Sequence, residues 1–149
     1  MKNKETGMTL IVKTITRLTI GLILLYGVYI VLHGHLTPGG GFAGGVIIAL
    51  SFIHLMIAFG KETALKKLSQ AAASIIESLG ALMFLSIALL GFLGGHFFFN
   101  FFMHKGKPFE LLSAGIIPLC NIAISLKVGA GLFAIFAALI LFRGVKEKE

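Results

Sequence analysis

The sequence predicts an all-α integral membrane protein with four transmembrane helices. Hydrophobic residues make up 57% of the 149 residues, and the mean hydropathy is +0.99. A soluble domain of this length cannot hide so large an apolar fraction from water. The apolar residues fall into four runs of membrane-spanning length, and most of the charged residues lie between them. We expect a single membrane domain, 1–149, with spans at about 10–32, 41–59, 72–95 and 116–142.

The first span carries two basic residues near its start. Lys13 and Arg17 are four residues apart and so share one helix face. We interpret them as long side chains that extend to the lipid head groups rather than as part of an ion path. The apolar run is too long for a signal peptide, and no small-residue cleavage site follows it. We therefore expect the span to be retained.

A glycine-rich stretch, HGHLTPGGGFAGG at His33–Gly45, joins the first two spans. Pro38 favours a turn before the glycines, and the glycines permit positive φ angles. Glycines four residues apart share a face at the start of the next helix, which favours close helix packing in lipid. Two such pairs are present, Gly40 with Gly44 and Gly41 with Gly45.

The connection after the second span, Lys61–Gln70, is short and charged. Its leucines are spaced for a short helix on the membrane surface. The third span then carries Glu77 at the head of a face of small residues, formed by Ala81, Ala88, Gly91 and Gly95. The aromatic stretch His96–Met103 that follows is typical of an interfacial belt, although a face against a neighbouring protein is an alternative.

The fourth span is the least regular of the four. Its apolar run is longer than one untilted crossing needs, and it contains Pro118, Asn121 and Lys127. Proline removes a backbone donor and kinks a helix interior. We expect the helix to begin near Pro118 or to be broken there.

Basic residues in short flanking segments predict the orientation. Ten lysines and arginines lie on the side of the two termini and of the second connection, whereas the far side has only Lys105 and Lys107. We therefore expect a multi-pass protein of the cell membrane with both termini in the cytoplasm. The net charge of +7 is explained by this placement, and no nucleic-acid partner is expected.

Three ionisable residues inside spans are candidates for an ion pathway: Glu77, Lys127 and, more weakly, His54. Such residues are costly in lipid and usually face protein or water. For each, the alternative is a satisfied polar group that locks helices together. Three groups are too few to carry protons across a membrane, so a chain that moves ions in this way needs partner subunits.

Other chemistry finds little support in the sequence. The glycines lack the Lys-Ser/Thr ending of a phosphate-binding loop, and no aspartate is present for a catalytic triad. His33 and His35 are two residues apart without a third ligand, which makes a poor metal site. We expect no catalytic residue, no metal and no cofactor.

The glycine-rich stretch resembles the signature of the B subunit of Mrp-type multisubunit sodium/proton antiporters, the MnhB family. The matching residues are His33, Pro38, Gly39, Gly40, Gly41, Phe42, Gly44 and Gly45. A looser second likeness covers Ile117–Ala123, with Pro118 and Asn121, and continues through Lys127–Gly131. The four spans and the length agree with that family.

The resemblance implies a small, non-catalytic subunit of a cation/proton antiporter assembly, associated with sodium and hydrogen ion transport. It implies other antiporter subunits as partners, and hydrogenase-like subunits where the module belongs to an archaeal membrane-bound hydrogenase or a related sulfur-reducing complex. Two alternatives stay open. The chain could be a stand-alone, homo-oligomeric transporter or channel, or a purely structural membrane anchor.

Overall fold

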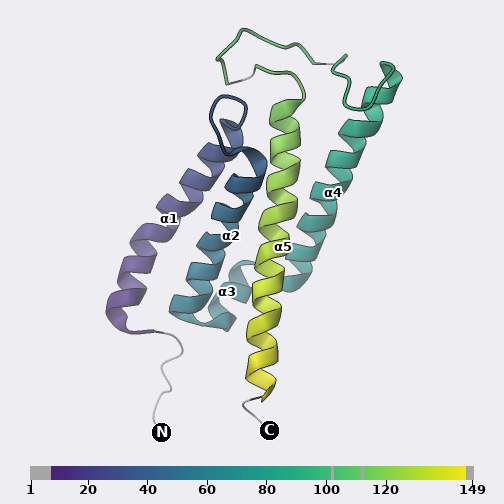
Figure 1. Cartoon of the computed structure of the whole chain (residues 1–149). Coiled ribbons are helices and arrows are strands. Elements are labelled where there is room, and N and C mark those ends of the chain that lie inside the picture. The colour runs from purple at the N-terminus through teal and green to yellow at the C-terminus, as the bar shows by residue number, and fades with distance from the viewer. Residues whose placement is uncertain (1–7, 102, 112, 147–149) are drawn as a thin grey trace, which may run out of the picture.

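The computed structural model describes residues 8–101, 103–111 and 113–146, and five helices occur in these ranges (Figure 1). They are α1 (Leu10–Leu32), α2 (Gly40–Phe59), α3 (Lys61–Lys67), α4 (Gln70–Leu93) and α5 (Ile117–Lys146). The described residues contain no strand. All the helices except α3 are long and apolar enough to cross a membrane. The predicted class, all-α with four spans, is confirmed.

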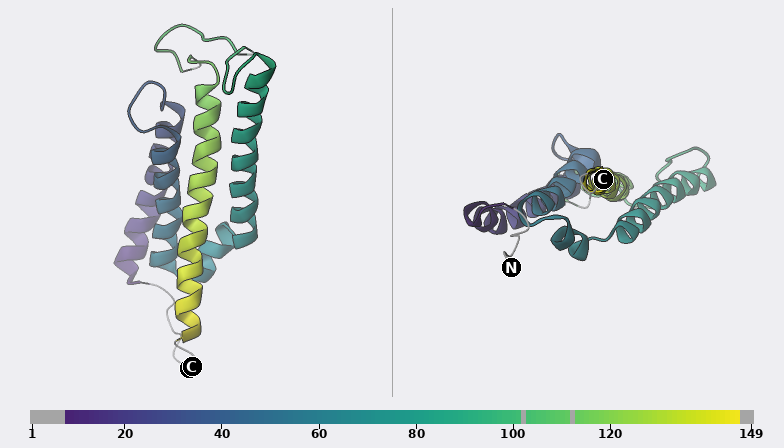
Figure 2. Two further views of the ribbon diagram at one scale, coloured as in Figure 1. Left: turned by 45° about the vertical axis from the view of Figure 1, so that its right-hand side comes forward. Right: turned by 90° about the horizontal axis from the view of Figure 1, so that it is seen from below.

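The four long helices form a single row in the order α1, α2, α5, α4, and not a closed bundle. The extensive helix contacts join α1 to α2, α2 to α5, and α5 to α4. Figure 2 (right) shows this row end-on, with α3 to one side of it. Only 22% to 33% of the residues in the apolar windows are buried. Both broad faces of the row are therefore largely uncovered in the isolated chain.

The last helix settles the question of Pro118. α5 begins at Ile117, so Pro118 lies in the first turn, where the missing backbone N–H had no helical partner to lose. The helix continues to Lys146, past the expected end at 142. The proline therefore starts this helix and does not break it.

The connector helix α3 packs against one face of the row. Its Ala64 is fully buried in a cluster to which α5 contributes Phe133, and Leu65 and Leu68 pack against that cluster. The expected short helix is present, and its apolar side contacts protein. The full buried cluster is Met56, Ala64, Ala73, Ala130, Phe133 and Ala137.

The loops gather at the end of the row opposite α3, where α1 ends and α5 begins (Figure 1). Much of the expected aromatic belt lies here, although Phe102 falls outside the described residues. Phe97 packs on Phe92, with ring centroids 3.9 Å apart, and Phe98 packs on Phe84. This loop thus folds back onto the end of α4. Its role as an interfacial belt stays a prediction.

Candidate functional site

Lys127 and Glu77 form an ion pair across the contact between α5 and α4. The Lys127 Nζ donates to the Glu77 Oε1 over 2.8 Å, although the residues are 50 positions apart in sequence. Lys127 stands ten residues into α5, or about 15 Å along the axis. It therefore lies near the middle of the apolar segment Ile117–Phe142. The structure thus brings two of the three ion-pathway candidates together, ten residues into α5 and seven residues into α4.

Two glycines shape the surroundings of this pair. A Cβ atom on Gly80 would lie 2.7 Å from the Lys127 backbone nitrogen and 2.8 Å from the Ala123 carbonyl oxygen. The backbones of α4 and α5 therefore touch at this level. Gly131, one turn after Lys127, faces the carboxylate, since a Cβ there would lie 3.5 Å from the Glu77 carboxyl carbon. Sequence reasoning missed Gly80; its seven-residue spacing from Ala73, which is also buried, was the available signal.

The ion pair is not buried within the chain. The exposed fraction of the side chain is 51% for Lys127 and 36% for Glu77. Gly131, beneath the carboxylate, is two residues from Phe133 and so lies on nearly the opposite side of α5. Phe133 belongs to the cluster that contacts α3. The pair therefore lies on the face of the row away from α3, which we call the open face.

His54 lies at a different seam, between α2 and α1. Its Nε2 is 3.0 Å from the hydroxyl oxygen of Thr16, which is only 1% exposed. A groove of about 440 Å³ opens beside His54, with mostly aliphatic walls that include Leu50 and Ile53. In the row, α5 lies between α2, which carries His54, and α4. The structure does not bring His54 to the Glu77–Lys127 pair, and sequence reasoning had not singled out Thr16.

On one side of α2, the glycine-rich motif forms a close contact with α5. The Gly41 N–H donates to the Asn121 Oδ1 over 3.2 Å, and a Cβ on Gly41 would collide with the Asn121 backbone. One turn on, a Cβ on Gly45 would lie 2.9 Å from the Ser125 carbonyl oxygen. The glycine-rich stretch His33–Gly45 thus contacts the second family-like stretch, Ile117–Ala123, through Asn121.

The next glycine of the motif faces α1. A Cβ on Gly44 would collide with Val31 and would lie 3.0 Å from the Gly27 carbonyl oxygen. Ahead of the helix, Gly39 and Gly40 adopt φ angles of 137° and 67°, which only glycine adopts readily. Pro38 stands directly before them in the turn, whereas the Phe42 side chain is exposed.

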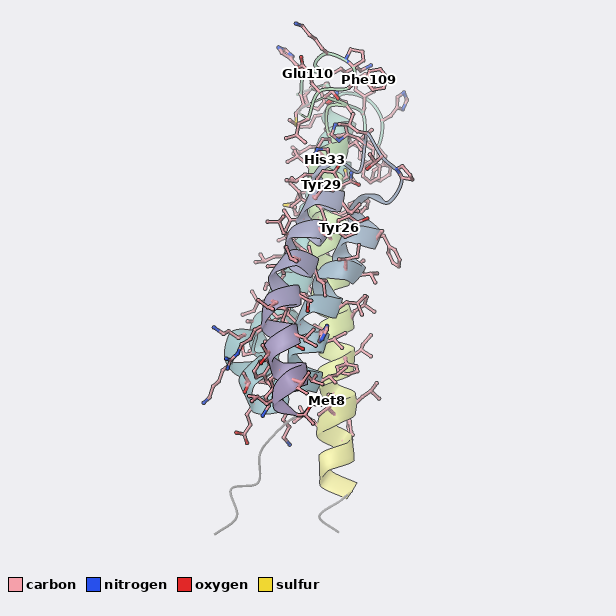
Figure 3. The ribbon with its side chains drawn as sticks, turned by 90° about the vertical axis from the view of Figure 1, so that its left-hand side faces the viewer. Met8, Tyr26, Tyr29, His33, Phe109 and Glu110 are labelled. Carbon is pink, nitrogen blue, oxygen red and sulfur yellow. The ribbon has the colours of Figure 1, made fainter. Side chains whose placement is uncertain are left out.

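The two loop histidines contact protein groups. The His33 ring stacks on Tyr29 with centroids 4.1 Å apart, and Tyr29 stacks in turn on Tyr26 (Figure 3). His35 places its Nε2 3.1 Å from the Glu110 carbonyl oxygen and so joins the two loops at this end. Within the described part of the chain, no three His, Cys, Asp or Glu residues gather into a metal site.

These features define a class of protein: a multi-pass helical membrane protein with glycine-lined helix seams and an ion pair within its spans. The family follows from comparison with known proteins. The chain belongs to the MnhB family, because the family model described as "Domain related to MnhB subunit of Na+/H+ antiporter" matches residues 11–134. It is therefore a member of a membrane antiporter subunit family, as the glycine-rich stretch predicts.

Individual relatives support this assignment. The chain is 45% identical over 117 residues to an uncharacterized protein of Methanocaldococcus jannaschii, covering 74% of this chain and 44% of that protein. It is 40% identical over 58 residues to a Staphylococcus aureus protein that bears the name antiporter subunit mnhB2, covering 39% of this chain and 41% of that one. The chain thus spans less than half the length of these relatives.

A solved structure shows the same fold. The chain resembles a component of the membrane-bound sulfane sulfur reductase, an archaeal respiratory membrane complex, with a TM-score of 0.72 and 29% identity. The match covers 93% of this chain and 63% of that one. The chain is thus similar in fold to a component of a respiratory membrane complex.

Proposed function

We propose that this chain is a small, non-catalytic membrane subunit of an Mrp-type cation/proton antiporter module and contributes to the movement of sodium ions and protons. The observation that carries the proposal is the partly exposed Glu77–Lys127 pair within the spans. The family and the likeness to a respiratory complex support it.

The energetics favour a functional role for the pair. A charged residue at the centre of a spanning helix costs about 2.5–3.5 kcal/mol on insertion scales. A pair that served only to join α4 and α5 would be better enclosed between those two helices. Glu77 and Lys127 instead keep large fractions of their side chains accessible on the open face. Accessible ionisable groups of this kind within spans commonly mark an ion or proton pathway.

The setting of the module is also a proposal. We infer that the parent assembly is a membrane-bound hydrogenase, a related sulfur-reducing complex or an Mrp antiporter, with larger subunits that perform the pumping. We expect 1–149 to act as one membrane domain with both termini in the cytoplasm, because the basic residues flank that side. The start of α1, the helix α3 and the end of α5 lie at one end of the row, which is consistent with this orientation (Figure 1).

Sodium-dependent proton movement in inverted membrane vesicles that contain the complete complex tests the proposal. We expect Glu77→Gln and Lys127→Met each to lower the transport rate, measured per assembled complex, about tenfold or more. Matched controls are Glu62→Gln and Lys66→Met, which alter the same residue types at exposed positions of α3. These controls should leave transport unchanged.

The same experiment separates the two alternatives. Normal assembly with unchanged transport in Glu77→Gln and Lys127→Met would show a purely structural anchor. Sodium/proton exchange by vesicles that contain only the purified chain would show a stand-alone transporter. Either result would refute the proposal.

A further inference from the structure

The open face combines the ion pair with an apolar groove. The groove has a volume of about 250 Å³ and lies between α2 and α5, with Leu50 and Ile53 on one wall and Ile135 and Leu139 on the other. Ile135 is one turn after Gly131, the residue beneath the Glu77 carboxylate, and so continues the same side of α5. Its side chain is largely exposed. The groove and the charges thus form one continuous surface.

Lipid cannot satisfy all the hydrogen-bond donors on the open face. The Lys127 ammonium group carries three N–H donors, of which Glu77 Oε1 takes one. Hydrocarbon tails offer no acceptor for the others, and unsatisfied polar groups are avoided in the bilayer core. A lysine this far from either helix end cannot extend its ammonium group to the head groups, as residues near helix ends do. The missing acceptor must come from another protein segment, or from water that such a segment encloses.

We propose that the open face binds a transmembrane helix of another subunit, and that this helix presents an Asp or Glu carboxylate to Lys127. A helix is the form in which a single segment brings a side-chain acceptor to this depth with its own backbone satisfied. The groove beside Ile135 receives its apolar side chains.

A carboxylate is favoured over a neutral acceptor because it forms a charge-assisted hydrogen bond with the ammonium group. Glu77 and Lys127 cancel one another, so the described pair has no excess negative charge to hold a cation. A partner carboxylate adds a charge-assisted bond to the free side of Lys127. The resulting group of two carboxylates and one lysine carries a net negative charge, which a proton or a sodium ion can balance. The inference deepens the proposed function by naming its partner.

The first test is photo-crosslinking in the complete complex, with p-benzoyl-phenylalanine replacing Ile135. We expect an adduct with a transmembrane helix of another subunit, and mass spectrometry of the linked peptide should find an Asp or Glu in that helix. Adducts with lipid only, with a second copy of this chain, or with a helix that has no carboxylate would each overturn the proposal.

A second test uses the charges and the identified carboxylate. We expect Lys127→Met to lower co-purification of the linked subunit severalfold, because a buried partner carboxylate then lacks its cation. Replacing that carboxylate by its amide in the same variant should restore co-purification. Lys66→Met, on exposed α3, is the matched control and should have no effect. Loss without restoration would contradict the carboxylate assignment.

The two proposals fail in different ways. If transport is unaffected by Glu77→Gln and Lys127→Met but the crosslink forms, the docking helix is supported and the ion-path role is refuted. If transport is lost while the crosslinker at position 135 reacts only with lipid, the ion-path role is supported and the docking helix is refuted.

Discussion

Gly80 of α4 lies directly against the backbone of Lys127 of α5, so close that a Cβ on Gly80 would be 2.7 Å from the Lys127 nitrogen. This contact fixes the level at which the two helices meet. Glu77, nearly one turn earlier on α4, then faces the lysine side chain at 2.8 Å. The ion pair therefore depends on the absence of a side chain at position 80.

A larger residue at position 80 should separate α4 from α5. We expect Gly80→Val to destabilise the protein by about 1–3 kcal/mol, the usual cost of overpacking. The melting temperature of the detergent-solubilised complex measures this. Gly21→Val is the matched control, because a Cβ on Gly21 meets nothing within 4 Å. Equal melting temperatures for the two variants would rule out the tight contact.

Removing the Asn121 side chain should weaken the seam between α2 and α5. Asn121→Ala leaves the buried Gly41 N–H without its acceptor, which typically costs about 1–3 kcal/mol. We expect a lower melting temperature in the same assay. Ser78→Ala removes an exposed hydroxyl that bonds only to its own helix, so it should change little. A variant Asn121→Ala as stable as the parent would show that the Gly41 bond is dispensable.

The Thr16–His54 contact should serve stability and not transport. Thr16→Val keeps the shape of the side chain but removes the hydroxyl beside the His54 Nε2, and we expect a loss of about 1 kcal/mol. Thr19→Val removes an exposed hydroxyl that bonds within its own helix and is the control. Sodium-dependent proton movement should be retained in both variants. A transport defect specific to Thr16→Val would place His54 in the ion path.

The orientation can be read with single cysteines. In a Cys120→Ser background, Lys105→Cys should react with a membrane-impermeant maleimide added to intact cells. Lys66→Cys should react only after the cells are permeabilised, because its helix lies on the side of the basic flanks. The reverse pattern would place both termini outside.

Hydropathy made the four spans predictable, because an apolar run of this length avoids water by crossing the bilayer as a helix. Pro118 also marked the start of α5, although proline chemistry alone left a break within the helix equally open. The order of helices in the row was not predictable. A small residue such as Gly44 identifies a face for close packing, but nothing in its spacing says which helix will meet it.

The sequence identified the residues of the candidate site but not which of them contact one another. Glu77 and Lys127 stand out in the sequence because they interrupt apolar runs, yet their pairing depends on the register between α4 and α5. That register depends on Gly80. Gly80 points about 100° away from Ala81 on the helix, so it does not belong to the small-residue face that the sequence analysis favoured. His54 stood out for the same reason as the other two but belongs to another seam, with Thr16.

The position of α5 between α2 and α4 has a consequence for biosynthesis. A chain made from its N-terminus inserts α4 before α5 exists, and α4 finds its principal packing surface only on α5. Glu77 therefore enters the bilayer ahead of the lysine that will neutralise it. During that interval the carboxylate must remain near the head groups or be shielded by the insertion machinery, until α5 inserts between α2 and α4 and completes the row.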